Sequence, residues 1–269
     1  MKTKNILVTI AAAAMALTSC NNTGETITIV ESPSFTTSVT RMNGTQFEKN
    51  DEVGIYMLDA GTATAKDSKK YIVEAGGTTL KATEDGELKY PRKGAVDFRA
   101  YYPYAQLDNG IYNINLSTKP VDLLYAVAEK KTYEDESVAL TFNHKLARLS
   151  FTVQKDSNAE GKDVKLQVKV IVDGTFNVLD GTLNAGQTQD VLDVKDNKVI
   201  VVPSDNISLI VTCDEVTKEV KINNKITSGK NTNITVNIKG LDLTVNTGAI
   251  KVSPWEDETG TDMDVNLNK

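Results

Sequence analysis

The chain has 269 residues and carries 30 Lys and Arg against 36 Asp and Glu, which gives a formal net charge of −6. Hydrophobic residues make up 40% and charged residues 25%, values that exclude disorder over most of the length and a polytopic membrane protein. The acidic balance argues against a phosphate-backbone partner, so no nucleic acid is expected to bind. Abundant β-branched residues, only 6 Pro and the lack of long helix-period stretches predict an all-β protein.

The amino terminus has the features of an export signal. Lys2 and Lys4 precede an apolar run over 6–17, which is too short to span a bilayer. Small residues then lead into Cys20, a sequence that resembles the lipobox of bacterial lipoproteins. That resemblance implies cleavage before Cys20 and its acylation, and two or more acyl chains anchor a protein stably where one does not. Residues 1–19 are therefore predicted to be a lipoprotein signal peptide, with a plain secretory signal and an incidental Cys as the alternative.

Short alternating segments separated by Gly, Asn and Asp predict many strands. In the first half they are expected at 26–30, 35–39, 53–58, 71–73, 96–104, 111–116 and 138–142. In the second half they are expected at 149–153, 164–170, 175–179, 199–202, 207–213, 219–222, 232–238 and 241–245. Residues 61–70 are interpreted as a loop, and 123–128 as either a short helix or a strand. This texture indicates two β-sandwich domains in tandem, over 42–147 and 148–269.

No pattern in the sequence points to catalysis. His144 is the only His, so any triad or His-based metal cluster would need it, but its place beside the domain boundary favours a structural role. Cys213 lies in an expected strand and is interpreted as a small buried hydrophobe rather than a nucleophile. Phosphate-loop and EF-hand patterns are absent, and nothing selects a particular pair of carboxylates. The chain is therefore expected to be neither an enzyme nor a cofactor or metal binder.

A succession of motifs resembles the fimbrillin (Mfa-like) family, the type V pilus subunits of anaerobic Gram-negative bacteria. The segments that carry the resemblance are Thr40-Arg41 and the ranges 47–56, 96–104, 122–126, 138–142, 144–147 and 250–255. Their order, together with the lipobox, is more specific than any one of them. Asn50 stands where the family usually has Gly, and Asn tolerates positive φ better than most residues, so the turn can survive.

The resemblance implies two tandem transthyretin-like Greek-key β-sandwiches that assemble by strand exchange. The precursor would travel to the outer membrane as a lipoprotein, and a trypsin-like, Arg-specific protease would cut after an Arg in the first long loop. Carried onto this chain, the cut would fall between Arg41 and Met42 and remove the lipidated pro-segment 20–41. The displaced strand would take Ile27, Ile29 and Phe35 out of the core. The alternative is that Thr40-Arg41 is an ordinary strand end, as in anchor subunits that keep their lipid.

An extended segment of a neighbouring subunit, self or related, would then fill the opened groove. Met263, Val265 and Leu267 alternate near the carboxy terminus, so 261–269 is the predicted donor strand. Residues 250–252 also alternate, and either segment could instead be the last strand of the second sandwich. The implied function is a structural or adhesive subunit of a cell-surface fimbria.

The alternative function is a surface lipoprotein that never polymerises and binds a glycan or host ligand. Aromatic side chains that could stack on a sugar are concentrated in one stretch of the first half. They are Tyr101, Tyr102, Tyr104 and Tyr112, and the interpretation as core residues is favoured over sugar stacking.

Overall fold

The computed structural model describes residues 31–39, 47–157, 159–205, 207–214, 216–239, 242–243 and 251–254. Within these ranges the regular secondary structure is entirely β-strand, so the all-β expectation is confirmed. The first eight strands are β1 (Ser34–Val39), β2 (Glu52–Asp59), β3 (Ala65–Val73), β4 (Thr79–Ala82), β5 (Val96–Tyr102), β6 (Ile111–Asn115), β7 (Leu124–Lys131) and β8 (Ser137–His144). The others are β9 (Ala147–Lys155), β10 (Val164–Ile171), β11 (Asp173–Asn177), β12 (Thr182–Ala185), β13 (Gln189–Asp193), β14 (Lys198–Val201), β15 (Ile207–Cys213), β16 (Val216–Ile222), β17 (Lys230–Lys239), β18 (Asp242–Leu243) and β19 (Lys251–Pro254).

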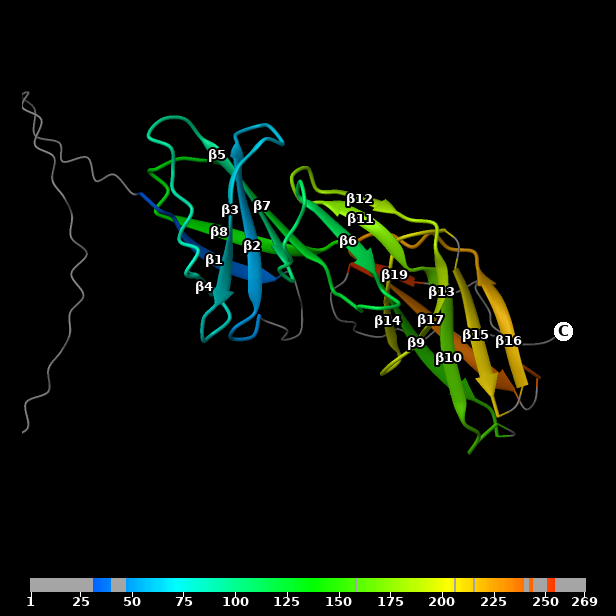
Figure 1. The fold of residues 1–269 in the computed structure, drawn as a ribbon. Coiled ribbons are helices and arrows are strands. Elements are labelled where there is room, and N and C mark those ends of the chain that lie inside the picture. The colour runs from blue at the N-terminus through cyan, green and yellow to red at the C-terminus, as the bar shows by residue number, and fades with distance from the viewer. Residues whose placement is uncertain are drawn as a thin grey trace, which may run out of the picture.

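Seven strands of the first half close into a barrel in the order β1-β4-β3-β2-β5-β7-β8. The barrel closes because β1 pairs with β4 on one side and with β8 on the other. Its interior is filled by one hydrophobic cluster, in which Phe35, Phe98 and Phe142 are fully buried. Figure 1 shows this barrel at one end of an elongated molecule.

The second half is built from two sheets, β13-β10-β15-β16 and β14-β9-β17-β18, with β19 beside β17. Apolar residues of β9, β10, β15 and β17 form a second hydrophobic cluster between them, and Leu149, Val168 and Leu209 in this cluster are fully buried. Cys213 is buried in the same cluster, as expected for a small hydrophobe.

A small sheet, β12-β11-β6, joins the two halves of the chain. Strand β6 from the first half pairs with β11 from the second, and Tyr112 lies opposite Phe176. The Tyr125 hydroxyl of β7 donates a hydrogen bond to the Val178 carbonyl at 2.9 Å. Figure 1 shows this sheet between the barrel and the larger sheets. The division into two transthyretin-like domains between residues 147 and 148 stays a prediction. The pairing of β6 with β11 joins strands from the two sides of this boundary.

Most strands expected in the described ranges are present, and two interpretations are resolved. The interpretation of 61–70 as a loop is wrong for its second part, because β3 begins at Ala65 and pairs with β2. The ambiguous segment 123–128 belongs to strand β7. Asn50 adopts a φ of 75°, which is the left-handed turn expected where the family usually has Gly. The strand expected at 26–30 lies outside the described residues.

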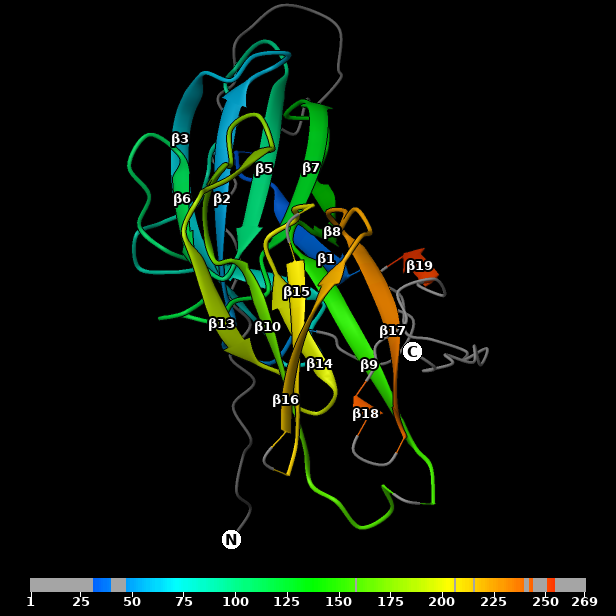
Figure 2. The same ribbon diagram turned by 90° about the vertical axis from the view of Figure 1, so that its right-hand side faces the viewer.

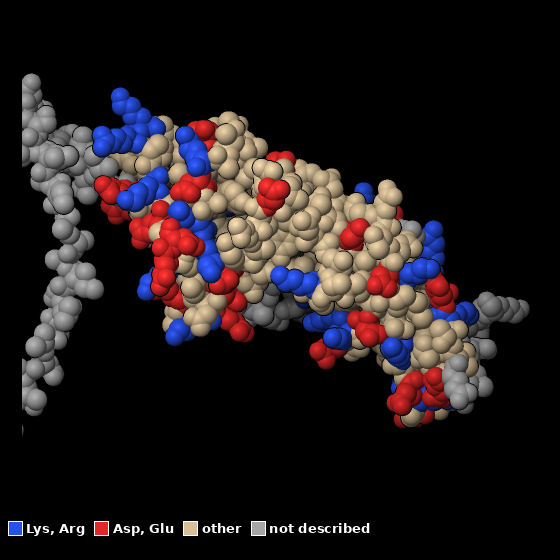
Figure 3. All heavy atoms as spheres, viewed as in Figure 1, with Lys and Arg blue, Asp and Glu red and all other residues tan. Residues whose placement is uncertain are grey.

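The surface carries charges of both signs. Figure 3 shows acidic and basic side chains interspersed at both ends of the molecule, with a mainly uncharged surface between them. The described residues include no helix long and apolar enough to cross a membrane.

Candidate functional site

The strand β1 closes the barrel. It lies between β4, with which it pairs antiparallel, and β8, with which it pairs parallel from Ser34↔Ser137 to Val39↔Phe142. Figure 2 shows β1 beside β8 and away from its chain neighbour β2. The chain links β1 to the other barrel strands only at its carboxy-terminal end. If that link were cut, another extended segment could take its place between β4 and β8.

Backbone hydrogen bonds fix β1 on both sides. The Ser34 amide donates to the Glu136 carbonyl at 2.9 Å, and the Thr37 amide donates to the Thr78 carbonyl at 2.8 Å. Upstream, the Tyr90 amide donates to the Glu31 carbonyl at 2.9 Å. These bonds are independent of side-chain identity, so a different extended segment could make those of the strand itself.

The side chains of β1 alternate between the barrel interior and its surface. Phe35 is 0% exposed, and its ring meets the rings of Tyr71 and Phe98 edge to face at centroid distances of 5.2 and 5.1 Å. Thr37 is 5% exposed, and its hydroxyl donates to the Gly77 carbonyl at 3.0 Å. Val39 is partly buried against the same cluster. Removing β1 would therefore uncover a groove with apolar walls and one buried acceptor.

Two unpaired strand edges would flank that groove. Strand β4 contributes the buried Leu80, and β8 contributes Val138, Leu140 and Phe142, which are all fully buried. Unpaired backbone edges and exposed apolar side chains are together a template for pairing with another chain. The geometry suits non-covalent assembly rather than a chemical reaction.

Of the predicted site residues, the structure describes Phe35, which points into the core as expected for the displaced strand. Several predicted residues lie outside the described ranges. They are Cys20, predicted to be lipidated, Arg41 and Met42, predicted to flank the cut, and Ile27 and Ile29, predicted to leave with the displaced strand. The predicted donor residues Met263, Val265 and Leu267 also lie outside these ranges. The described part of the site is thus the acceptor side alone.

Burial of Tyr71 beneath Phe35 makes the barrel sensitive to alkali. Burial is the main cause that raises the pKa of Tyr71 to about 12, and it also raises the pKa of Tyr90, Tyr101 and Tyr125. A folded-state pKa above the unfolded value of about 10 means that the stabilisation is complete below pH ~10 and is lost as the pH rises toward 12. Urea unfolding across this window should show a falling free energy of unfolding. In Tyr71→Phe the fall should be shallower; an unchanged slope would contradict the assignment to Tyr71.

The single His has a structural place. His144 is buried at the end of β8, and its Nδ1 lies 2.7 Å from Asp122 Oδ1. Asp122 precedes β7, so this contact ties the start of one barrel strand to the end of the next, as expected for a residue at the junction. Within the described residues, no group of three His, Cys, Asp or Glu side chains is arranged to hold a metal ion.

The tyrosines considered for glycan stacking are largely enclosed. Tyr101 and Tyr112 are buried in the second cluster, whereas Tyr102 and Tyr104 are partly buried. The rings of Tyr101 and Tyr104 stack at 6.3 Å, and Lys70 Nζ lies 5.4 Å from the centre of the Tyr104 ring. These contacts are between residues of the chain itself and build no open aromatic platform in the described part of the site.

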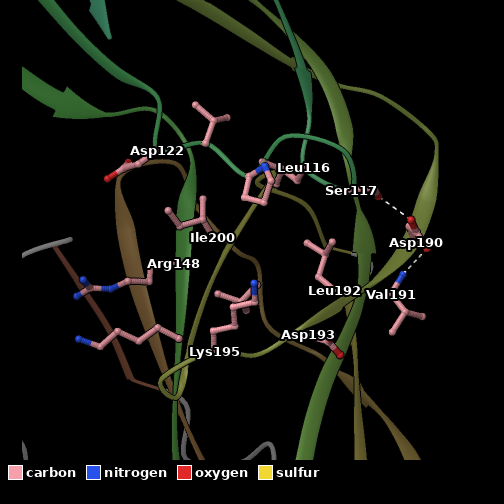
Figure 4. A pocket seen from close by; sticks show the side chains of 14 residues that line it. Leu116, Ser117, Asp122, Arg148, Asp190, Val191, Leu192, Asp193, Lys195 and Ile200 are labelled. Atoms are coloured by element: carbon pink, nitrogen blue, oxygen red, sulfur yellow. Dashed lines mark hydrogen bonds between the residues drawn. The ribbon is translucent and has the colours of Figure 1, made fainter. Parts of the chain in front are cut away.

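A separate hollow of about 620 Å³ lies between strands β13 and β14 of the second half and the segment that follows β6 in the first half. Figure 4 shows Leu116, Leu192 and Ile200 around its apolar centre. At its edge, Ser117 Oγ donates to Asp190 Oδ2 at 2.6 Å, and this hydrogen bond lowers the pKa of Asp190. Sequence reasoning gave no signal for this hollow, because β13 and β14 are far in sequence from the 116–122 segment.

Comparison with known proteins places this architecture. Residues 40–255 match the family described as fimbrillin-like. The "Putative fimbrium subunit Fim1C" of Bacteroides uniformis is 30% identical over 179 residues, which cover 58% of this chain and 59% of that protein. The match therefore spans less than two thirds of the relative's length.

Two crystal structures share the fold. One is described as a "putative cell adhesion protein" from Bacteroides uniformis, with a TM-score of 0.70 and 24% identity, covering 84% of this chain and 97% of that chain. Another, with the same description, comes from Bacteroides ovatus, with a TM-score of 0.66 and 18% identity, covering 85% of this chain and 99% of that chain. The fimbrillin-like family consists of structural subunits rather than enzymes. Because the family match covers most of the sequence, the chain belongs to the fimbrillin-like family.

Proposed function

We propose that this protein is a structural or adhesive subunit of a bacterial surface fimbria, exported as a lipoprotein and assembled by protease-triggered donor-strand exchange. Membership of the fimbrillin-like family supports the fimbrial role. The observation that carries the mechanism is the position of β1. It completes the barrel between β4 and β8, and it ends at Val39, two residues before Arg41.

A cut after Arg41 by a trypsin-like protease would sever the only covalent link between β1 and the rest of the barrel. The strand would then be held only by non-covalent contacts: its edge hydrogen bonds, the burial of Phe35 and Val39, and the bond from the Thr37 hydroxyl to the Gly77 carbonyl. Its departure opens the groove, and an extended segment of another subunit restores the lost backbone pairing and buries the exposed walls. In the proposal, residues 261–269 act as such a donor toward the next subunit.

The order of features along the chain links cleavage to release from the membrane. Cys20 and β1 lie on the same side of Arg41, so one cut separates both the lipid and the closing strand from the rest of the protein. An uncut chain would remain lipid-anchored at the outer membrane with its groove filled. Such a chain would be the anchor subunit of the fimbria or a non-polymerising binding lipoprotein.

The test is the intact mass and amino terminus of the protein recovered from the cell surface. A chain that begins at Met42 supports the proposal, and a chain that begins at an acylated Cys20 contradicts cleavage. Arg41→Ala should keep the lipid attached. Arg92→Ala is the matched control, because Arg92 is an exposed Arg outside the proposed site and its loss should leave processing unchanged.

A further inference from the structure

The three side chains that β1 turns toward the barrel interior differ in chemistry. Phe35 is aromatic, Thr37 carries a hydroxyl and Val39 is aliphatic. The intervening Thr36 and Ser38 are exposed. A segment that replaces β1 must offer its own inward side chains to the same surroundings, so the contacts of these three residues define what the groove accepts.

The position of Phe35 is shaped for an aromatic ring. Tyr71 and Phe98 meet it edge to face from two sides, at interplanar angles of 78° and 84°. Both partners are buried, and Phe98 is held by the strand β5. Edge-to-face pairs contribute beyond the area that they bury, so a flexible aliphatic side chain such as Met fills this place less favourably.

The position of Thr37 requires a hydrogen-bond donor. The Gly77 carbonyl that accepts from its hydroxyl is buried in a turn where Gly76 and Gly77 both have positive φ, at 104° and 71°. The Gly77 amide donates to the Glu74 carbonyl at 3.2 Å, which holds the turn in place. An aliphatic side chain at this position would bury the carbonyl without the hydroxyl, and losing one partner of a buried hydrogen bond is costly.

The chain's own proposed donor does not match this pattern. Met263, Val265 and Leu267 are aliphatic at all three alternate positions, and 261–269 contains no aromatic residue. When these three side chains are laid over those of β1, Val265 falls at the position of Thr37 in either strand direction. The tail would therefore lose both the aromatic contacts and the bond to the Gly77 carbonyl.

We infer that the groove left by β1 selects a donor strand with an aromatic, a hydroxyl and an aliphatic residue at alternate positions, supplied by a different subunit rather than by the tail of a second copy. The residue at the Thr37 position is the specificity determinant. This inference rests on the proposed function, because it requires that β1 leave and that another strand take its place.

The experiment uses the uncut chain, which still contains β1, with a recognition sequence for a site-specific protease inserted in the 40–46 segment. After cutting, fluorescent peptides compete with the bound β1, and their affinities are measured by fluorescence anisotropy. The peptide that copies 31–40 is compared with its Thr37→Val and Thr36→Val forms. The two changes are chemically identical, but the first falls on the buried side chain and the second on its exposed neighbour.

Thr37→Val should weaken peptide binding about tenfold or more, and Thr36→Val should change it little. The peptide 261–269 should bind at least about tenfold more weakly than the copy of 31–40, and its Val265→Thr form should recover part of the difference. Equal binding of the Thr37→Val and Thr36→Val peptides, or a tail that binds as tightly as the copy, would overturn the selectivity alone. Failure of the unchanged copy to exchange would overturn the proposed function and the inference with it.

Discussion

Phe35→Ala is expected to lower the free energy of unfolding of the uncut chain by about 3–5 kcal/mol. The substitution removes a fully buried ring and leaves a cavity between Tyr71 and Phe98, whose positions are fixed by their own strands. Urea unfolding followed by fluorescence measures the loss. Thr36→Ala is the matched control on the same strand, because Thr36 is exposed and its loss should cost little.

The Phe35→Ala variant also tests whether β1 stays in the assembled subunit or leaves it. If β1 is lost from the assembled protein, Phe35→Ala should destabilise the precursor and leave the stability of the mature, strand-exchanged subunit unchanged. The cut precursor should also release its Ala-substituted strand faster, since the burial of Phe35 is the largest side-chain contribution of β1. Equal destabilisation of the precursor and the assembled subunit would mean that β1 stays in place.

Local patterning predicted the strands whose alternation is matched by burial. Strands β1 and β8 are examples, because every second side chain is buried or partly buried and most of these side chains are apolar. The end of β3 was expected at 71–73, but its first six residues were missed because they are mostly polar and exposed or half-buried. Its strand conformation comes from pairing with β2, a tertiary interaction that overrides the local composition.

Pairings between distant segments left no signal in the sequence. The strands β6 and β11 are about sixty residues apart and meet in the sheet that joins the two halves. Similarly, the parallel contact of β1 with β8 connects residues about one hundred positions apart. The family resemblance and the lipobox-like segment therefore led to the proposed function, and the structure supplied the contacts of β1 that the motifs could not give.

Alternation gave a different picture of β5 from the one observed. In the motif Val96-Asp97-Phe98-Arg99-Ala100 the charged residues would face solvent, yet Asp97 is 1% and Arg99 is 9% exposed. Asp97 lies at an irregularity between β5 and β7, where the register shifts between Val96 and Phe98. A bulge changes the direction of side chains and leaves backbone groups without a partner strand group. Here the Asp97 carboxylate accepts a hydrogen bond from the backbone amide of Lys130.

Both carboxylate oxygens of Asp97 accept backbone hydrogen bonds, one from the bulge in β7 and one from the turn between β2 and β3. Oδ1 accepts from the Lys130 amide at 2.8 Å, and Oδ2 accepts from the Gly61 amide at 2.9 Å. Lys130 has a φ of 55°, an unfavourable conformation for a residue with a side chain, so the carboxylate holds a strained residue at the bulge of β7. Arg99 Nη2 lies 3.5 Å from Asp97 Oδ2 and 3.3 Å from Glu129 Oε1, which pairs the buried charge.

Asp97→Ala should therefore lower the free energy of unfolding by about 3–5 kcal/mol, because it leaves the buried Arg99 and the Lys130 amide without this carboxylate. Asp97→Asn should cost less, since its amide oxygen can still accept one of the two backbone bonds. Urea unfolding of both variants measures the difference.

Asp59→Ala is the control on the neighbouring β2, because that side chain is 49% exposed and its ion pair with Lys66 contributes little. If Asp97→Ala and Asp59→Ala were equally mild, the carboxylate would not be what holds β5 and β7 together at the bulge. A large loss in Asp97→Ala alone would show that this carboxylate stabilises the pairing of β5 with β7, on the barrel wall whose Phe98 contacts Phe35 of β1.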